Sequence, residues 1–305
     1  MAAAALCLAA SLSFRPAAAQ DHDEDSAHCA GAVPDLKIDG CTALIVSRHD
    51  PSILAWAFYN RGTAFEHRGQ YDRALHDFNE VIGFNRDFAE AFYSRGIVYD
   101  DTGEYDRAIQ DYNRAIWLKS DYAAAFDNRG VAWKQKGEYD RAIQDFNHAI
   151  KLKPDDAIAF NNRGNAFRQK GDDDRAIQDY DQAIRLQPDY AAAFNNRGII
   201  YNQRGDYDRA LQDYDQAIRF KPDYAAALTN RGHLYLMKSA SAAIADYNAA
   251  LAINPSMAAS LYGRGIAERM NGDLTASDAD IAAATRIDPA VAGQVVKWSA
   301  PSPGK

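Results

Sequence analysis

Residues 157–190 read AIAFNNRGNAFRQKGDDDRAIQDYDQAIRLQPDY, and residues 191–224 repeat the pattern as AAAFNNRGIIYNQRGDYDRALQDYDQAIRFKPDY. The same block recurs along the chain, and its fixed marker is an Asn-Arg-Gly tripeptide or a close variant. The marker arginines are spaced by 34 residues five times and by 33 residues at the end: Arg61, Arg95, Arg129, Arg163, Arg197, Arg231 and Arg264. A fixed period of this length is typical of a repeat solenoid. Stacked neighbours, not a single core, then supply the stability.

Each block contains two helical segments. Phe160 and Phe167 are seven residues apart and therefore lie on one face of the first helix. Gly171 ends that helix, an acidic residue opens the second, and Pro188 closes the block. Gly164 and the alanines of the second helix allow the two helices to approach closely. Seven such blocks span residues 55–88, 89–122, 123–156, 157–190, 191–224, 225–257 and 258–291.

A 34-residue helix-turn-helix with small residues and aromatics at these positions resembles the tetratricopeptide repeat. The resemblance covers all seven blocks. It implies an all-α, right-handed superhelical solenoid of seven helix-turn-helix repeats with helical caps. It also implies that a protein or an extended peptide binds in the concave groove that the first helices line.

The blocks depart from the family pattern at two positions together. Family repeats usually carry a leucine before the first-helix glycine and an aromatic before the central aromatic of the second helix. Here the first is arginine and the second is aspartate, so we predict one Arg–Asp pair per repeat. The alternative is that the arginines line the groove. The predicted pairs are Arg61–Asp77, Arg95–Asp111, Arg129–Asp145, Arg163–Asp179, Arg197–Asp213, Arg231–Asp246 and Arg264–Asp280.

The resemblance also implies which side chains line the groove. Asparagines are frequent among them, and each side-chain amide both donates and accepts, so it can pair with a peptide backbone. The alternative is that these amides only keep a solvated face soluble. The predicted groove residues are Tyr59, Asn60, Tyr93, Ser94, Asp127, Asn128, Asn161, Asn162, Asn165, Asn195, Asn196, Thr229, Asn230 and Tyr262.

Charge limits the class of ligand. The net charge is −8, from 34 Lys+Arg against 42 Asp+Glu, which argues against a general nucleic-acid binder. Early groove positions are acidic and the middle ones are basic, so we expect a basic stretch of ligand near Glu66, Asp100 and Asp127. The acidic residues are Glu66, Glu90, Asp100, Asp101 and Asp127, and the basic ones are Lys134 and Arg168.

The N-terminus has the pattern of a targeting segment. An apolar run is followed by three alanines, so residues 1–20 are predicted to be a signal peptide cleaved between Ala19 and Gln20. The protein would then be periplasmic or secreted. The alternative is a disordered alanine-rich tail. No apolar run reaches the roughly 18–20 residues that a membrane span needs.

Residues 21–54 are expected to cap the first repeat. The acidic stretch 21–28 is expected to be disordered, and residues 34–48 resemble a second helix without its partner. Cys29 and Cys41 would remain after cleavage, and an even pair in an exported chain predicts a disulfide. The alternative is two buried thiols. Residues 292–305 are expected to form a C-terminal cap and a loose tail.

No motif points to catalysis, a cofactor or a metal. His67 and His76 are the closest histidine pair within the repeats, but they fall on different helices. Gly-rich phosphate loops and nucleophile motifs are absent. We therefore predict a non-catalytic scaffold or adaptor of the cell envelope that binds a protein or peptide. Two alternatives are a self-assembling structural protein that forms homo-oligomers, and an enzyme with a closed polar pocket and a perturbed ionisable group.

Overall fold

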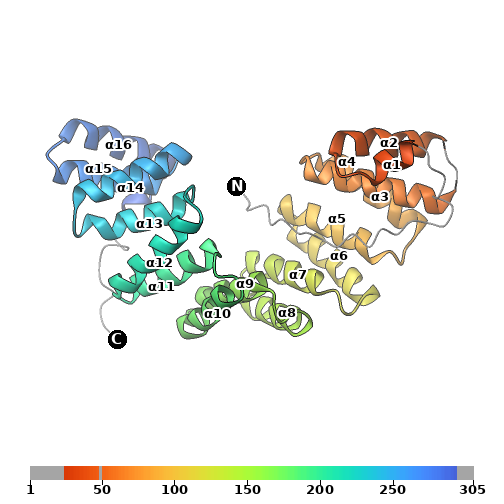
Figure 1. Ribbon diagram of the computed structural model, residues 1–305, viewed down its shortest axis with the longest axis horizontal. Coiled ribbons are helices and arrows are strands. Elements are labelled where there is room, and N and C mark those ends of the chain that lie inside the picture. Colours follow the sequence, from red (N-terminus) through yellow and green to blue (C-terminus); the bar gives the residue numbers. More distant parts are fainter. Residues whose placement is uncertain (1–23, 48–49, 294–305) are drawn as a thin grey trace. The chain divides into compact units, whose positions relative to one another are not determined.

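The computed structural model describes residues 24–47 and 50–293, and every regular element in those ranges is a helix (Figure 1). The all-α expectation is therefore confirmed. The helices fall into two compact units, Met1–Leu152 and Lys153–Lys305. The predicted signal peptide 1–20 and the tail from residue 294 lie outside the described residues.

The first unit contains a cap of two helices and three helical pairs. Helix α3 packs on α4, α5 on α6, and α7 on α8. The helices are α1 (Glu24–Ala30), α2 (Pro34–Ser47), α3 (Pro51–His67), α4 (Tyr71–Phe84), α5 (Ala89–Asp101), α6 (Tyr105–Leu118), α7 (Ala123–Gln135) and α8 (Tyr139–Leu152).

The second unit contains four helical pairs, in which each odd-numbered helix packs on the next even-numbered one. A further helical turn begins at Val291. The helices are α9 (Ala157–Gln169), α10 (Asp173–Leu186), α11 (Ala191–Gln203), α12 (Tyr207–Phe220), α13 (Ala225–Leu236), α14 (Ala240–Ile253), α15 (Ala258–Met270) and α16 (Leu274–Ile287).

Glycines set both the turn and the packing of a pair. Gly137, in the turn between α7 and α8, has φ 77°, a left-handed conformation that other residues disfavour. Gly130 lies at the contact between the same two helices. A Cβ built there would be 2.7 Å from Cε1 of Phe146, so only glycine lets the aromatic ring lie directly on the α7 backbone.

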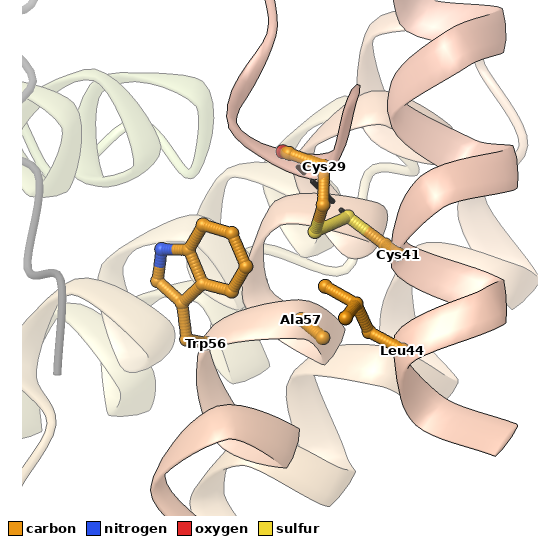
Figure 2. Close-up of a cluster of buried hydrophobic side chains, with 5 residues drawn as sticks. All are labelled: Cys29, Cys41, Leu44, Trp56 and Ala57. Carbon is orange, nitrogen blue, oxygen red and sulfur yellow. Dashed lines mark hydrogen bonds between the residues drawn. A yellow bond between two sulfur atoms is a disulfide. The ribbon is translucent and has the colours of Figure 1, made fainter. Parts of the chain in front are cut away.

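The N-terminal cap differs from the expectation. Glu24–Ala30 is helix α1, so its residues are not disordered, and it packs on α2, so α2 does not lack a partner. A disulfide joins Cys29 of α1 to Cys41 of α2, which excludes two buried thiols. Figure 2 shows this disulfide buried beside Leu44 and Trp56. A seven-residue acidic helix is unstable by itself, so the covalent link and this small core explain its order.

In the two described ranges, no helix combines the length and the apolar character needed to cross a bilayer.

Candidate functional site

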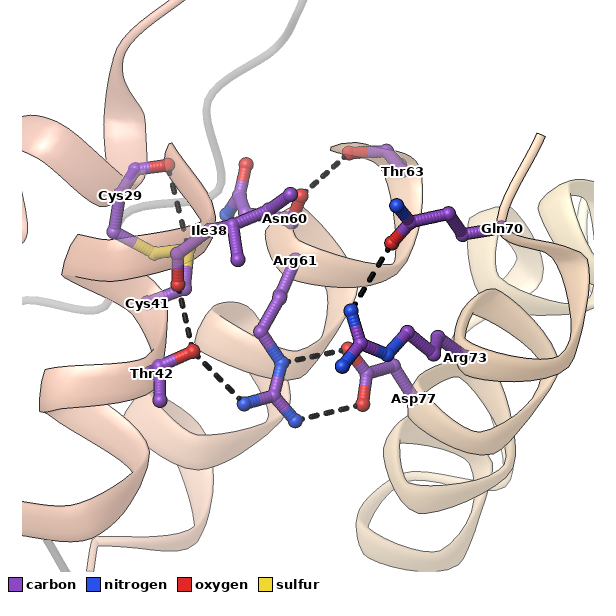
Figure 3. A network of polar contacts seen from close by, with 10 residues as sticks. All are labelled: Cys29, Ile38, Cys41, Thr42, Asn60, Arg61, Thr63, Gln70, Arg73 and Asp77. Carbon is purple, nitrogen blue, oxygen red and sulfur yellow. Dashed lines mark hydrogen bonds and ion pairs between the residues drawn. A yellow bond between two sulfur atoms is a disulfide. The ribbon is translucent and has the colours of Figure 1, made fainter. Parts of the chain in front are cut away.

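The repeat arginine lies between the two helices of its pair. In the first repeat, Nε and Nη2 of Arg61 donate to the two carboxylate oxygens of Asp77, at 2.8 and 2.9 Å (Figure 3). The guanidinium also lies 5.3 Å from the ring centroid of Phe58 and 5.7 Å from that of Phe65. The planar group is therefore held by a two-point ion pair and by aromatic rings on either side along the helix.

The structure brings together every predicted Arg–Asp pair in the same two-point arrangement. The arginine side chains are 15–24% exposed and the aspartates only 1–13%, so the pairs are mostly covered by the helices. This geometry favours the structural role over the groove-lining alternative. The pairs are Arg61–Asp77, Arg95–Asp111, Arg129–Asp145, Arg163–Asp179, Arg197–Asp213, Arg231–Asp246 and Arg264–Asp280.

Most of these arginines also contact the preceding repeat, a role that the sequence reasoning missed. Nη1 of Arg95 donates to Oδ1 of Asn79 on α4 at 2.6 Å, and Nη1 of Arg61 donates to Thr42 of the cap at 3.1 Å. The same third bond recurs as Arg129–Asn113, Arg197–Asp181, Arg231–Asp215 and Arg264–Asn248. Within the repeats, the sequence did carry a signal for this contact, because a polar residue lies sixteen positions before the arginine. One side chain thus links two helices of its own repeat to a third from the neighbour.

Several predicted groove residues of the second unit are buried instead, which corrects that prediction. Asn161, Asn195 and Asn230 are only 4–5% exposed. Asn196 Nδ2 donates to Asn161 Oδ1 at 3.0 Å, and Asn230 Nδ2 donates to Asn195 Oδ1 at 2.9 Å. These amides hydrogen-bond successive first helices to one another, because a buried amide must find a partner. Thr229 is likewise buried and its hydroxyl lies 2.6 Å from that of Ser260.

The equivalent positions of the first unit also connect neighbouring first helices. Ser94, 5% exposed, lies too deep to meet a ligand, and its hydroxyl is 3.4 Å from that of Tyr59. Asn128 Nδ2 donates to the Tyr93 hydroxyl at 3.1 Å. The predicted groove residues that remain partly exposed are Tyr59, Asn60, Tyr93, Asp127, Asn128, Asn162, Asn165, Asn196 and Tyr262.

The acidic residues of the first unit are close enough to perturb one another. Burial, and then the charge of Asp101, raises the pKa of Glu66 to about 7. The same two causes raise the pKa of Asp100 to about 6, although Lys134 opposes them. The Tyr71 hydroxyl donates to Asp101 at 3.3 Å. Glu66 on α3 and Asp100 and Asp101 on α5 therefore lie near enough for the charge of Asp101 to act on the other two, at the C-terminal ends of these first helices.

The corresponding position of α9 in the second unit is basic. Nε of Arg168 is shielded from solvent and has no hydrogen-bond partner among the described residues. Its charge lowers the pKa of the Tyr180 hydroxyl, which burial raises more strongly. That hydroxyl donates to Asn165 at 2.8 Å. The predicted charge gradient along the whole array stays a prediction.

Within the described residues, no group of three His, Cys, Asp or Glu side chains could hold a metal ion. His67 and His76 lie on different helices. An open hollow of about 330 Å³ lies beside the α9–α10 turn and is lined by residues 170–175 and Arg204. Two ion pairs line it, Arg175 with Asp172 and Arg204 with Asp174.

Comparison with solved structures identifies the fold. A tetratricopeptide repeat protein from Parabacteroides merdae matches with a TM-score of 0.63 at 18% identity, over 81% of this chain and 98% of that one. The APC/C hetero-tetramer Cut9–Hcn1 matches with a TM-score of 0.66 at 16% identity, over 87% of this chain and 52% of that one. MamA from Desulfovibrio magneticus matches with a TM-score of 0.51 at 19% identity, over 56% and 97%. At these identities the likeness concerns the fold alone.

No curated protein matches the sequence significantly. Family models give a direct assignment. Two models described as tetratricopeptide repeats match residues 55–88, 89–122 and 233–292, and one described as TPR repeat matches 133–167, 164–203 and 198–239. Together they span most of the helical array, and the chain therefore belongs to the tetratricopeptide repeat family.

Proposed function

We propose that this protein is a non-catalytic scaffold or adaptor of the cell envelope that binds a protein segment along its first helices. The observation that carries the proposal is the array of tetratricopeptide pairs, in which first helices such as α7 and α9 keep partly exposed polar side chains, among them Asn128 and Asn162. Gln135 and Gln169, the last residues of α7 and α9, are exposed. Extended repeat surfaces of this kind serve binding more readily than chemistry.

The location in the envelope is supported by two features. The alanine-rich stretch before Gln20 has the composition of a cleaved signal peptide. The Cys29–Cys41 disulfide belongs to a chemistry that persists in oxidising compartments. We expect the mature protein to begin near Gln20, and to be released by osmotic shock. N-terminal sequencing of the released protein tests this, and a chain that stays with the cytosolic fraction and keeps Met1 would refute export.

Site-specific photo-crosslinking tests the binding face. A photoreactive amino acid would replace Gln135 on first helix α7 or, as the control, Trp117 on second helix α6, whose side chain is 71% exposed. We expect crosslinks to a partner protein from position 135 and few from position 117. Crosslinks only from position 117 would place the site on the second helices. Crosslinks only to further copies of this chain would support the self-assembling alternative.

A further inference from the structure

The three carboxylates of the first unit differ from the other buried acids of the array. Each repeat aspartate of the second helices is held at two points by an arginine. In contrast, no ion pair among the described residues involves Glu66 or Asp100. Both side chains are only partly exposed. The fold therefore holds Glu66 and Asp100 in a partly shielded place without an ion pair of their own, although the charge of Lys134 acts on Asp100.

Two buried polar atoms beside these carboxylates also have no partner. Tyr112 is 0% exposed and its hydroxyl forms no hydrogen bond among the described residues. Its ring lies against Gly96, one helical turn before Asp100 on the same face of α5. Burial and the charges of Asp100, Tyr93 and Asp101 raise the pKa of Tyr112, so the hydroxyl end of the ring lies near these groups. The Asn128 amide, which donates to the Tyr93 hydroxyl at 3.1 Å, opposes this rise. Oδ1 of Asp100 is likewise shielded and accepts no hydrogen bond.

A buried polar group without a partner costs free energy, and native folds keep such groups rarely. A cluster of like charges adds to that cost. Perturbed groups of this kind gather at functional sites, where a ligand completes the arrangement. A cationic group that donates hydrogen bonds would satisfy these acceptors. The described ranges contain no group of three His, Cys, Asp or Glu side chains that could hold a metal ion.

We propose that Glu66, Asp100 and Asp101, with the Tyr112 hydroxyl, form a binding subsite for a lysine or arginine side chain of an extended peptide. This inference rests on the proposed function and specifies the partner. An ammonium or guanidinium group carries three or five donors. It reaches the carboxylates on a long flexible stem, which suits acceptors spread over two helices better than the compact coordination shell of a metal.

Occupancy of this subsite depends on pH. The groups that face the carboxylates are Lys134 from α7, Tyr71 from α4, Tyr112 from α6, and Tyr59 and Glu90 from α3 and α5. Glu66 and Asp100 change charge between pH 8 and 5.5, because their pKa values are raised to about 7 and about 6. Both are ionised at pH 8 and gain protons below pH 7 and pH 6, respectively. A cation therefore binds more tightly at pH 8 than at pH 5.5. At a pH where the free carboxylates are partly protonated, binding of the cation releases those protons.

The test uses the mature chain, residues 20–305, on an array of 15-residue peptides of balanced composition. We expect the bound peptides to be enriched in lysine and arginine at pH 8. The double variant Glu66→Gln/Asp100→Asn should bind them about tenfold more weakly, the effect of losing a charge-assisted contact. The matched control Asp72→Asn/Asp121→Asn removes two charges from exposed positions and should change affinity less than about twofold.

A double-mutant cycle that combines protein and peptide variants separates a direct contact from a general effect of the protein's net charge. Replacing the critical lysine of a bound peptide by norleucine should weaken binding to the wild-type protein and leave binding to the double variant unchanged. Additive losses, or bound peptides without enrichment in basic residues, would overturn the subsite while the proposed peptide binding stands. Failure of the array to capture any peptide would overturn both. Circular dichroism of each variant verifies that it is folded.

Discussion

At the scale of single residues, one arginine per repeat replaces an apolar contact of the family by an ionic one. The exchange is tolerated because its partner is also exchanged, so that the guanidinium of Arg129, for example, meets two carboxylate oxygens and a third acceptor from the preceding repeat. A buried ion pair is weak evidence of net stability, because desolvation offsets much of the attraction. Removing only one partner is different, since it leaves a buried charge without compensation.

We expect Asp145→Asn to lower the free energy of unfolding by about 3 kcal/mol. Arg129 would then lose the carboxylate charge and one of its two acceptors on residue 145, and its guanidinium would lie uncompensated in the helix pair. The double variant Arg129→Leu/Asp145→Tyr, which restores the usual family residues, should recover most of the loss. Urea unfolding of Arg129→Leu, Asp145→Tyr and this double variant gives the coupling energy. Strictly additive losses would mean that the pair does not interact.

Glu66 should make the protein less stable at neutral pH than at mildly acidic pH. Its pKa is about 7 in the folded chain, against an ordinary value of 4.5. Between these values the folded state binds more protons than the unfolded state, so stability falls as pH rises from 4.5 to 7. We expect Glu66→Gln to stabilise the protein by about 1–3 kcal/mol at pH 8. The gain should vanish near pH 4, and a gain that is independent of pH in urea titrations would contradict the assignment.

At the scale of helices, close approach of the two members of a pair depends on a residue without a side chain. Gly130→Ala would place a Cβ 2.7 Å from Phe146, so we expect a loss of about 1–3 kcal/mol despite the better helix propensity of alanine. At Gly83, near the end of α4, an added Cβ would meet no atom within 4 Å. Gly83→Ala should therefore stabilise by about 0.5 kcal/mol. Thermal unfolding of both variants compares the two effects, and a stable Gly130→Ala protein would refute the packing argument.

The disulfide should stabilise the cap locally. It closes a segment with a sequence separation of 12 residues, which contributes roughly 3 kcal/mol in the chain-entropy model. In Cys29→Ser/Cys41→Ser we expect amide protection to be lost in α1 and α2 and kept in α11 to α14, because repeats communicate mainly with their neighbours. Hydrogen exchange with mass spectrometry measures this. Equal loss of protection in α11 to α14 would show that the cap controls the whole array.

The periodic residues predicted these helices well, because each block repeats its aromatic, glycine and alanine positions. The Arg–Asp pairs also followed from the sequence, since both positions depart from the family pattern together. Burial of Asn161, Asn195 and Asn230 did not follow, because it depends on amides 35 residues apart meeting across two first helices. Helix α1 was missed because its composition is that of a disordered segment, and only packing and the disulfide order it.

At the scale of the whole molecule, the two units carry opposite responses to mild acid. In the first unit, Glu66 and Asp100 favour protonation, so that unit gains stability as pH falls from 8. In the second unit, His233 is 2% exposed, and burial lowers its pKa to about 4. Its unfolded form takes up a proton below about pH 6.5, whereas the folded form does not. The second unit therefore loses stability as pH falls from 6.5 towards 4.

Tryptophan fluorescence separates the two responses. Trp56, Trp117 and Trp133 all belong to the first unit, so a Trp298→Phe chain reports only that unit by fluorescence and both units by circular dichroism. As pH falls from 8 to 5.5, we expect the free energy of unfolding of the first unit, measured by fluorescence in urea, to rise by about 1–2 kcal/mol. The transition seen by circular dichroism but not by fluorescence reports the second unit. Its free energy of unfolding should fall by about 1 kcal/mol over the same pH range. In His233→Leu that second shift should disappear while the first remains. Parallel shifts of both transitions, in either direction, would show that the acid response belongs to the array as one cooperative body and not to these residues.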